Sequence, residues 1–137
     1  MLPHKHFLIA GLAAVSAAAI WAPERTVIEI SKWAMVGGVA SATVDLDIVV
    51  LVFLKSGKEN RLRQFRNPLQ VFRKFDLFMD TISETNVLKI GMKTHFIFSA
   101  LIILVSYFYL NAYSLPITLG VISHLLSDIP NLRRKSA

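Results

Sequence analysis

Hydrophobic residues are gathered into long runs that charged residues interrupt at only a few places. Residues 7–23 carry no charge, residues 33–54 carry only Asp45 and Asp47, and residues 96–127 carry no formal charge. A small soluble bundle would show a polar stripe along every helix, and these runs show none. The pattern therefore predicts helices that span a membrane.

The longest run, residues 96–127, exceeds what one helix needs to cross a bilayer. An α-helix rises about 1.5 Å per residue, whereas the hydrocarbon core is about 30 Å thick. Ser114 can cap a new helix and Pro116 fits its first turn, so we expect a division near residues 111–116. The predicted fold is all-α: an integral membrane bundle of four short transmembrane helices that forms a single domain over residues 1–137. The four helices are expected at residues 6–22, 33–54, 95–112 and 115–129.

The segment between the second and third predicted helices, residues 55–94, contains an amphipathic stretch. Over residues 68–82 apolar side chains recur at near-helical spacing, with basic and acidic residues between them. Asn67 is a suitable cap and Pro68 a suitable first residue, so we expect a cytoplasmic amphipathic helix here. Its basic shoulder suits anionic lipid headgroups, and packing beneath the bundle is an equal alternative.

The amino-acid composition excludes several classes of protein. Hydrophobic residues make up 54% of the chain and charged residues only 18%, below the roughly 25% of an average soluble protein. There is no cysteine, which excludes a disulfide scaffold, a cysteine nucleophile and a thiolate metal site. The apolar content likewise excludes intrinsic disorder.

The net charge of +6 is distributed as membrane topology requires. Residues 55–94 hold nine of the 15 Lys and Arg residues, and Arg133, Arg134 and Lys135 follow the last predicted helix. Cytoplasmic segments carry such an excess, so we expect an integral protein of the cell or inner membrane with both termini and the long loop in the cytoplasm. This placement explains the charge without nucleic-acid binding. The alternative for residues 1–22 is a cleaved signal peptide.

Six ionisable side chains lie in or at the ends of the apolar runs, where an unpaired charge is costly and a functional role is the usual explanation. The predicted topology brings all six to the cytoplasmic half of the bundle, and each helix contributes at least one. They are His6, Asp45, Asp47, His95, His124 and Asp128. We interpret them as ligands of one or two divalent metal ions.

The spacing of these ligands limits how they can share a site. His124 and Asp128 are four residues apart and share one helix face. Asp45 and Asp47 point about 200° apart on a regular helix, so both reach one site only if the helix breaks near residues 43–47. Imidazole and carboxylate without sulfur suit Zn, Mn or Fe, and Mg is a further candidate.

Four segments around these residues resemble the motifs of a known family. They read KHFLIAG, GGVASATVDLDIVV, GMKTHFIFSA and LGVISHLLSDIP, and they resemble the LexA-regulated inner-membrane family of metal-dependent hydrolases. That family opens its first helix with a histidine and closes the second with a DxD pair. It enters the third helix through an HRGxTHS box and carries G-x-x-SHLxxD on the fourth. The resemblance covers nearly the whole chain, and SHLLSD is its most specific segment.

The resemblance implies a hydrolase whose substrate is a lipid phosphoester or a similar membrane-borne ester. It implies that the six residues hold the metal and that a metal-activated water is the nucleophile. Asp45 and His95 would take part in proton transfer, and Lys93 would steady an anionic substrate.

The chain departs from the family pattern at four positions. Ile48 stands where the family has a histidine after DxD, and Ile90, Gly91 and Phe96 replace the first His, the Arg and the Ser of the box. Metal binding survives these replacements more easily than hydrolysis does. Two alternatives therefore stay open: a non-enzymatic transporter subunit that uses the ligands as a metal or proton path, and a catalytically degenerate scaffold. A homo-oligomer is compatible with either.

Overall fold

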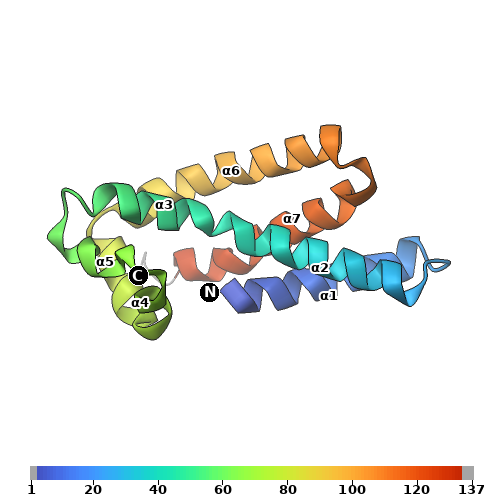
Figure 1. The fold of residues 1–137 in the computed structure, drawn as a ribbon, viewed down its shortest axis with the longest axis horizontal. Coiled ribbons are helices and arrows are strands. Elements are labelled where there is room, and N and C mark those ends of the chain that lie inside the picture. Colours follow the sequence, from blue (N-terminus) through green and yellow to red (C-terminus); the bar gives the residue numbers. More distant parts are fainter. Residues whose placement is uncertain (1–2, 134–137) are drawn as a thin grey trace. The chain divides into compact units, whose positions relative to one another are not determined.

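A computed structural model describes residues 3–133, with the burial of side chains from residue 4 to residue 129. Within this part every regular element is a helix, which confirms the predicted all-α fold. Arg134 and Lys135 of the predicted basic tail lie outside the described residues. The elements, with η marking 3₁₀ helices, are α1 (Pro3–Trp21), α2 (Val27–Val44), α3 (Leu46–Lys55), η1 (Asn60–Arg66), α4 (Pro68–Arg73), α5 (Phe75–Glu84), α6 (Val87–Tyr109), η2 (Asn111–Tyr113) and α7 (Ser114–Arg133) (Figure 1).

Four helical stretches of the described chain are long and apolar enough to cross a membrane. They are α1, α2 together with α3, α6, and α7 together with the turn before it. Large apolar side chains such as Leu12, Phe53 and Leu104 are exposed along them, as a surface in contact with lipid tails would be. Length and composition of these helices support membrane association. The stretches comprise His4–Trp21, Val27–Lys55, Val87–Tyr109 and Asn111–Ile129.

Two helices begin earlier than charge alone suggests. α2 begins at Val27 rather than at residue 33 because Thr26 and Glu29 form a capping box. The Thr26 backbone N–H donates to the Glu29 carboxylate (2.9 Å), and the Glu29 N–H donates to the Thr26 hydroxyl (3.3 Å). α6 begins at Val87, eight residues before the predicted start, because Lys89 and Lys93 are exposed and leave its apolar face continuous.

The predicted division of the last apolar run is confirmed. A short 3₁₀ turn, η2, separates α6 from α7, and α7 begins at Ser114. The Ser114 hydroxyl donates to the carbonyl of Asn111 across 2.9 Å, and Pro116 lies in the first turn of the new helix. The local chemistry of residues 111–116 therefore divides the run as the sequence indicates.

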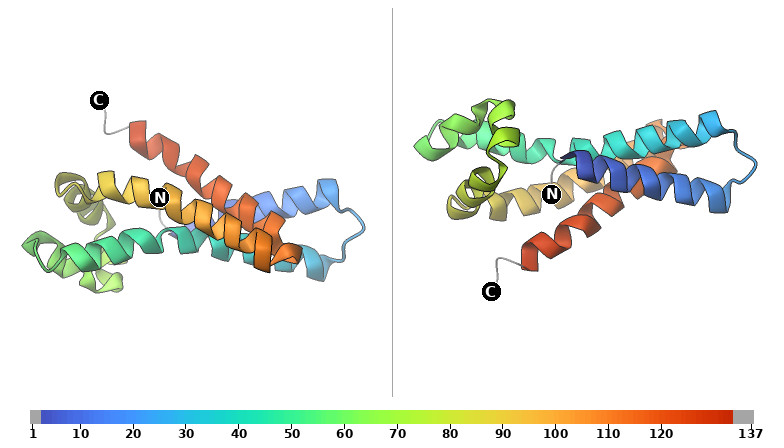
Figure 2. Two further views of the ribbon diagram at one scale, coloured as in Figure 1. Left: turned by 90° about the horizontal axis from the view of Figure 1, so that it is seen from above. Right: turned by 90° about the horizontal axis from the view of Figure 1, so that it is seen from below.

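The chain forms two compact units, Met1–Val44 with Ser99–Ala137, and Asp45–Phe98. In the first unit α1, α2 and α7 all pack against one another (Figure 2). Val44, Ile117 and Val121 form an apolar core between α2 and α7.

Glycine permits the close approach of these three helices. A Cβ atom on Gly38 would lie 2.8 Å from the ring of Phe7 on α1. A Cβ atom on Gly37 would lie 3.0 Å from the carbonyl oxygen of Pro116, and one on Gly120 would fall on the carbonyl of Gly37. These backbones are therefore in contact, as in membrane helix pairs that use small residues at their interfaces.

The second unit has its own core, built from α3, η1, α5 and the start of α6. The predicted amphipathic helix lies here, with Pro68 at its first position and the Asn67 side chain accepting from the Leu69 N–H across 3.0 Å. It is divided into α4 and α5 at Lys74, whose backbone (φ −126°, ψ 48°) is not helical. The apolar face of α5 is buried within the unit rather than exposed. The core residues are Val52, Leu62, Phe65, Phe78, Ile82 and Val87.

Candidate metal centre

Three helices of the first unit bring His6, Ser41 and His124 together. α1 and α2 are neighbours joined by a short turn, so the start of α1 lies beside the end of α2 (Figure 1). α7 packs on both helices and carries His124 and, one turn later, Asp128. Side chains far apart in the sequence thus meet in one small region.

Two imidazoles and one carboxylate form the centre of this region. His6 and His124 are both 0% exposed, and their ring centroids lie 4.0 Å apart. Nε2 of His6 lies 3.5 Å from Oδ1 of Asp128, and Nε2 of His124 lies 3.4 Å from Oδ2. The same nitrogen of each ring therefore faces the same carboxylate.

Two serine hydroxyls contact the Nδ1 atoms of the two rings. Ser127 Oγ lies 2.8 Å from Nδ1 of His6 and donates its single hydrogen to the carbonyl of His124, also 2.8 Å away. With its hydrogen on that carbonyl, the hydroxyl oxygen can accept from an Nδ1–H of His6. Ser41 acts alike, since it donates to the carbonyl of His6 (3.3 Å) and lies 3.4 Å from Nδ1 of His124. In the tautomer that carries hydrogen on Nδ1, each imidazole directs its Nε2 lone pair toward Asp128.

This arrangement fits a cation. A nitrogen lone pair and a carboxylate oxygen repel each other unless a positive charge lies between them. The 3.4 and 3.5 Å separations exceed the roughly 2.7–2.9 Å of a charge-assisted hydrogen bond. They agree with the ~3.4 Å between two ligand atoms that each lie about 2.1 Å from one tetrahedral ion. Neutral imidazole with carboxylate is also a donor set that zinc and similar divalent metals use.

Asp45 belongs to the same group. It is bonded to Val44, the last residue of α2, and the helix is interrupted at Asp45 before α3 begins. The backbone of Asp45 nevertheless keeps helical angles (φ −65°, ψ −14°), and Asp47 does not join Asp45 in one group. His6, Asp45, His124 and Asp128 each offer one ligand atom, and these four atoms lie within 4.8 Å of one another. We refer to these four residues as the His/Asp group.

The other two predicted ligands form a pair inside the second unit. Nδ1 of His95 lies 2.7 Å from Oδ1 of Asp47, and the Thr94 hydroxyl donates to Oδ2 across 2.7 Å. The His95 side chain is 1% exposed and that of Asp47 8%. The carboxylate thus orients the imidazole, as in proton-transfer pairs and in the outer shell of metal sites. Lys93, the predicted substrate-binding residue, is exposed two residues before His95.

The four residues that differ from the resembled motifs, Ile48, Ile90, Gly91 and Phe96, supply no polar side chain to the site. A Cβ atom on Gly91 would lie 3.5 Å from Cγ1 of Ile48, so these two replacements contact each other inside the second unit. Ile90 and Phe96 are exposed on α6 at 39% and 56%. None of the four offers a metal-binding atom.

Three hydroxyl residues at these sites, Ser41, Thr94 and Ser127, are absent from the sequence prediction. Serine and threonine are common inside membrane helices, where they bond to the carbonyl of the preceding turn. Their identity alone therefore does not distinguish them from Ser123, which only donates to Gly120 in its own helix (2.9 Å). Only Ser127 has a position that indicates a role at the site, because it lies three residues after His124 and next to Asp128.

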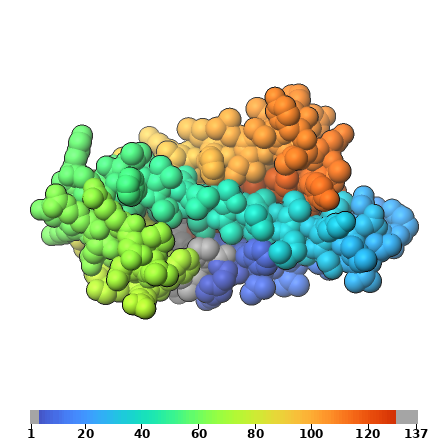
Figure 3. Space-filling model, in the orientation of Figure 1, coloured from blue at the N-terminus to red at the C-terminus, as the bar shows by residue number. Residues whose placement is uncertain are grey.

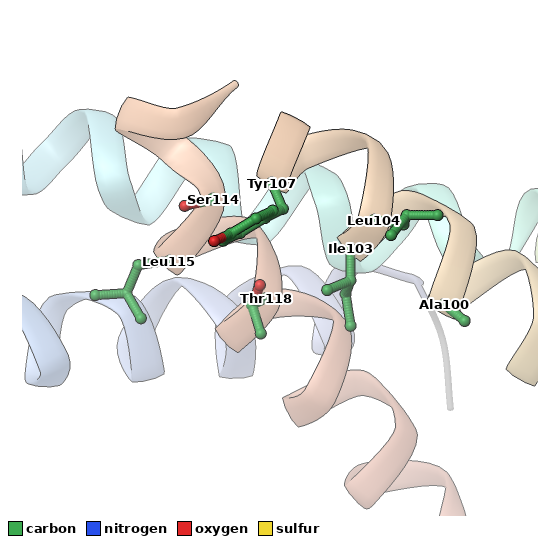
Figure 4. A pocket seen from close by; sticks show the side chains of 7 residues that line it. All are labelled: Ala100, Ile103, Leu104, Tyr107, Ser114, Leu115 and Thr118. Carbon is green, nitrogen blue, oxygen red and sulfur yellow. The ribbon is translucent and has the colours of Figure 1, made fainter. Parts of the chain in front are cut away.

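A separate apolar cavity of about 520 Å³ lies between α6 and α7 in the first unit (Figure 4). Tyr107, Ser114 and Thr118 contribute hydroxyls, and the rest of the lining is apolar. The lining residues are Ala100, Ile103, Leu104, Tyr107, Ser114, Leu115 and Thr118. Its walls suit a hydrocarbon chain rather than a polar molecule.

Comparison with known proteins identifies no relative, since no family model, curated protein or solved structure matches the chain. The function must therefore be argued from the site itself.

Proposed function

We propose that the protein is a membrane-embedded metal-dependent hydrolase acting on a lipid phosphoester or a similar membrane-borne ester. One observation supports the bound metal. The Nε2 atoms of His6 and His124, oriented by serines, lie 3.5 and 3.4 Å from the two oxygens of Asp128, which are distances that a shared cation would give. The resemblance of the four sequence segments to metal-dependent hydrolases supports the reaction class.

The His/Asp group would hold the ion. His6 and His124 supply neutral nitrogens, while Asp45 and Asp128 supply carboxylates that balance the charge of a divalent cation. Such an ion, when bound, polarises an ester or phosphoryl oxygen and lowers the pKa of a coordinated water.

His95 would move the proton. The Asp47 carboxylate holds its Nδ1 at 2.7 Å, which favours a hydrogen on Nδ1 and leaves Nε2 as the basic nitrogen. The same carboxylate stabilises the imidazolium that forms when Nε2 takes a proton. Lys93, exposed two residues before His95, would hold an anionic phosphoryl group by charge.

Two features favour a substrate from the bilayer. The helices that carry the His/Asp group are apolar enough to cross a membrane, so the nearest source of esters is lipid. The apolar cavity between α6 and α7 would accept a hydrocarbon chain. Thr118 at its edge precedes His124 by six residues, or about 9 Å of helical rise.

The first test measures bound metal by elemental analysis of detergent-purified protein. We expect stoichiometric zinc, manganese or iron in the wild type and its loss in the double variant His124→Ala/Asp128→Ala. The matched control is Ile122→Ala/Leu126→Ala, which removes two exposed side chains at the same spacing on the same helix. Absence of metal from the wild type after incubation with each ion would contradict the proposal.

Hydrolysis is tested separately with phospholipid and fluorogenic phosphoester substrates. We expect His95→Ala to lower turnover by roughly 10²–10⁴-fold, the usual contribution of a general base, while metal content is unchanged. Bound metal without turnover of any ester would instead favour the non-enzymatic transporter or scaffold.

A further inference from the structure

The short helix α4 presents apolar and basic side chains on one exposed face. No residue of α4, all of which is described, is buried. Leu69 and Phe72 are 63% and 55% exposed, and Arg73 is exposed as well. Positions i, i+3 and i+4 share a helix face, so these three side chains lie together. Val71 faces the other way and packs on the core of the second unit.

These apolar side chains differ from the exposed ones along the spans. Leu69 and Phe72 lie outside all four stretches that could cross a membrane, so the bilayer core does not account for their exposure. Figure 3 shows the light-green segment that contains η1 and α4 open on the face of the second unit. We call Leu69, Phe72, Arg73 and the following Lys74 the α4 face.

The charge around the α4 face is strongly positive. Residues 55–94 hold nine basic against four acidic residues, nearly the whole net charge of the chain. Arg63, Arg66, Arg73 and Lys74 are all exposed. Arg66 is held in place, because its Nε donates to the Ser56 hydroxyl across 2.7 Å.

The chain keeps α4 close to a membrane surface. The segment follows α3, the end of one candidate span, and precedes α6, the start of the next. The residues between α3 and α4 and between α4 and α6 are themselves largely folded into η1 and α5. The α4 face therefore cannot move far from the lipid headgroups.

We propose that the α4 face lies in the headgroup region of an anionic membrane, with Leu69 and Phe72 inserted among the lipids and Arg73 and Lys74 bound to phosphates. An anionic bilayer supplies both a hydrocarbon phase and negative charge at one place. A second copy of this chain would bring like charges together. A soluble acidic partner would match the charge but offers no reason for the two apolar side chains.

The absence of cysteine allows a direct test with a single label. The variant Phe72→Cys is labelled with a nitroxide and reconstituted into two kinds of vesicle. One contains phosphatidylcholine alone, and the other contains equal parts of phosphatidylcholine and anionic phosphatidylglycerol. We expect collisions with a water-soluble nickel reagent to fall several-fold in the anionic vesicles. Asp80→Cys, labelled on the exposed acidic side of α5, should remain accessible in both.

Charge reversal tests whether Arg73 and Lys74 bind lipid phosphates. Arg73→Glu/Lys74→Glu should restore nickel access to the label at position 72 in anionic vesicles. Lys32→Glu/Lys58→Glu changes the net charge equally at two other exposed lysines and should not. Equal access in both lipids would overturn the proposal, and so would immersion that persists in neutral lipid. Protection that depends on protein concentration in detergent would show a second copy on the α4 face instead. Each of these results is independent of metal content, so failure here leaves the proposed hydrolase untouched.

Discussion

Ser127 on α7 contacts His6 on α1 through a 2.8 Å separation of Oγ and Nδ1. Because the same hydroxyl donates to the carbonyl of His124, it joins the backbone of one ligand-bearing helix to the imidazole of another. The contact orients the His6 ring and favours the tautomer with hydrogen on Nδ1. Ser127 is thus a positioning residue for Nε2 of His6.

Replacing Ser127 by alanine should weaken metal binding without removing a ligand. Loss of an outer-shell partner typically lowers metal affinity by roughly 10–100-fold, because the imidazole no longer holds one tautomer and one orientation. Competition with a chromogenic chelator measures the affinity. Ser123→Ala is the control, since Ser123 bonds only to its own helix and should retain wild-type affinity. Equal effects of the two variants would show that only general helix packing was disturbed.

The sequence predicts the helices well because their cause is local. Runs without charge, the Ser114–Pro116 signal and the Asn67 cap depend on residues close in sequence, and each is found in the structure. The interruption at Lys74 was not foreseen, because the apolar spacing continues across it. No local pattern marks Lys74 as a break, and the packing of α5 on the core of the second unit depends on residues distant in sequence.

The candidate site is less predictable because it depends on which helices pack. Topology alone brings His6, Asp45, His124 and Asp128 to the cytoplasmic half of the bundle at different depths, and the structure groups these four. Topology does not reveal that Asp47 and His95 contact each other, with 2.7 Å between Oδ1 and Nδ1. Serine roles are likewise invisible in sequence, because a hydroxyl that orients a ligand has the same local pattern as one that bonds its own helix.

Gly120→Ala should destabilise the protein. The added Cβ would fall on the carbonyl of Gly37, and backbone cannot move aside as a flexible side chain can. Overpacking of this kind costs about 1–3 kcal/mol in free energy of unfolding. Denaturant unfolding in detergent micelles measures the loss. Gly57→Ala is the control, because its nearest contact is the Leu54 carbonyl at 3.9 Å; unchanged stability is expected there.

Asp47→Ala should also reduce stability, independently of any catalytic role. It removes one of the two acceptors of the Thr94 hydroxyl, the other being the carbonyl of Gly91, and a carboxylate partner of His95, a side chain only 1% exposed. Loss of a hydrogen bond to a charged group costs about 1.5–3 kcal/mol. Thermal unfolding followed by circular dichroism gives the change, with Asp80→Ala as an exposed carboxylate control. Matching melting temperatures for the two variants would contradict a structural role for the pair.

The distribution of basic residues predicts that residues 55–94 face the cytoplasm and that the turn before α7 faces the opposite side. In the cysteine-free chain, Lys58→Cys should react with a membrane-impermeant maleimide only after the cells are opened. Asn111→Cys in η2 should react in intact spheroplasts. The reverse pattern would invert the orientation and place the His/Asp group in the outer half of the bilayer.

Metal binding should be linked to folding. An ion that binds only the native state raises the free energy of unfolding by RT ln(1 + [L]/Kd), about 2.7 kcal/mol when the free ion exceeds Kd 100-fold. A chelator should therefore lower the melting temperature of the wild type, and added zinc should restore it. The variant His124→Ala/Asp128→Ala should not respond to either, because two of the four ligand atoms are gone. Ile122→Ala/Leu126→Ala should respond as the wild type does, since its ligands are intact. A response to chelator that survives the loss of His124 and Asp128 would place the bound ion elsewhere in the chain.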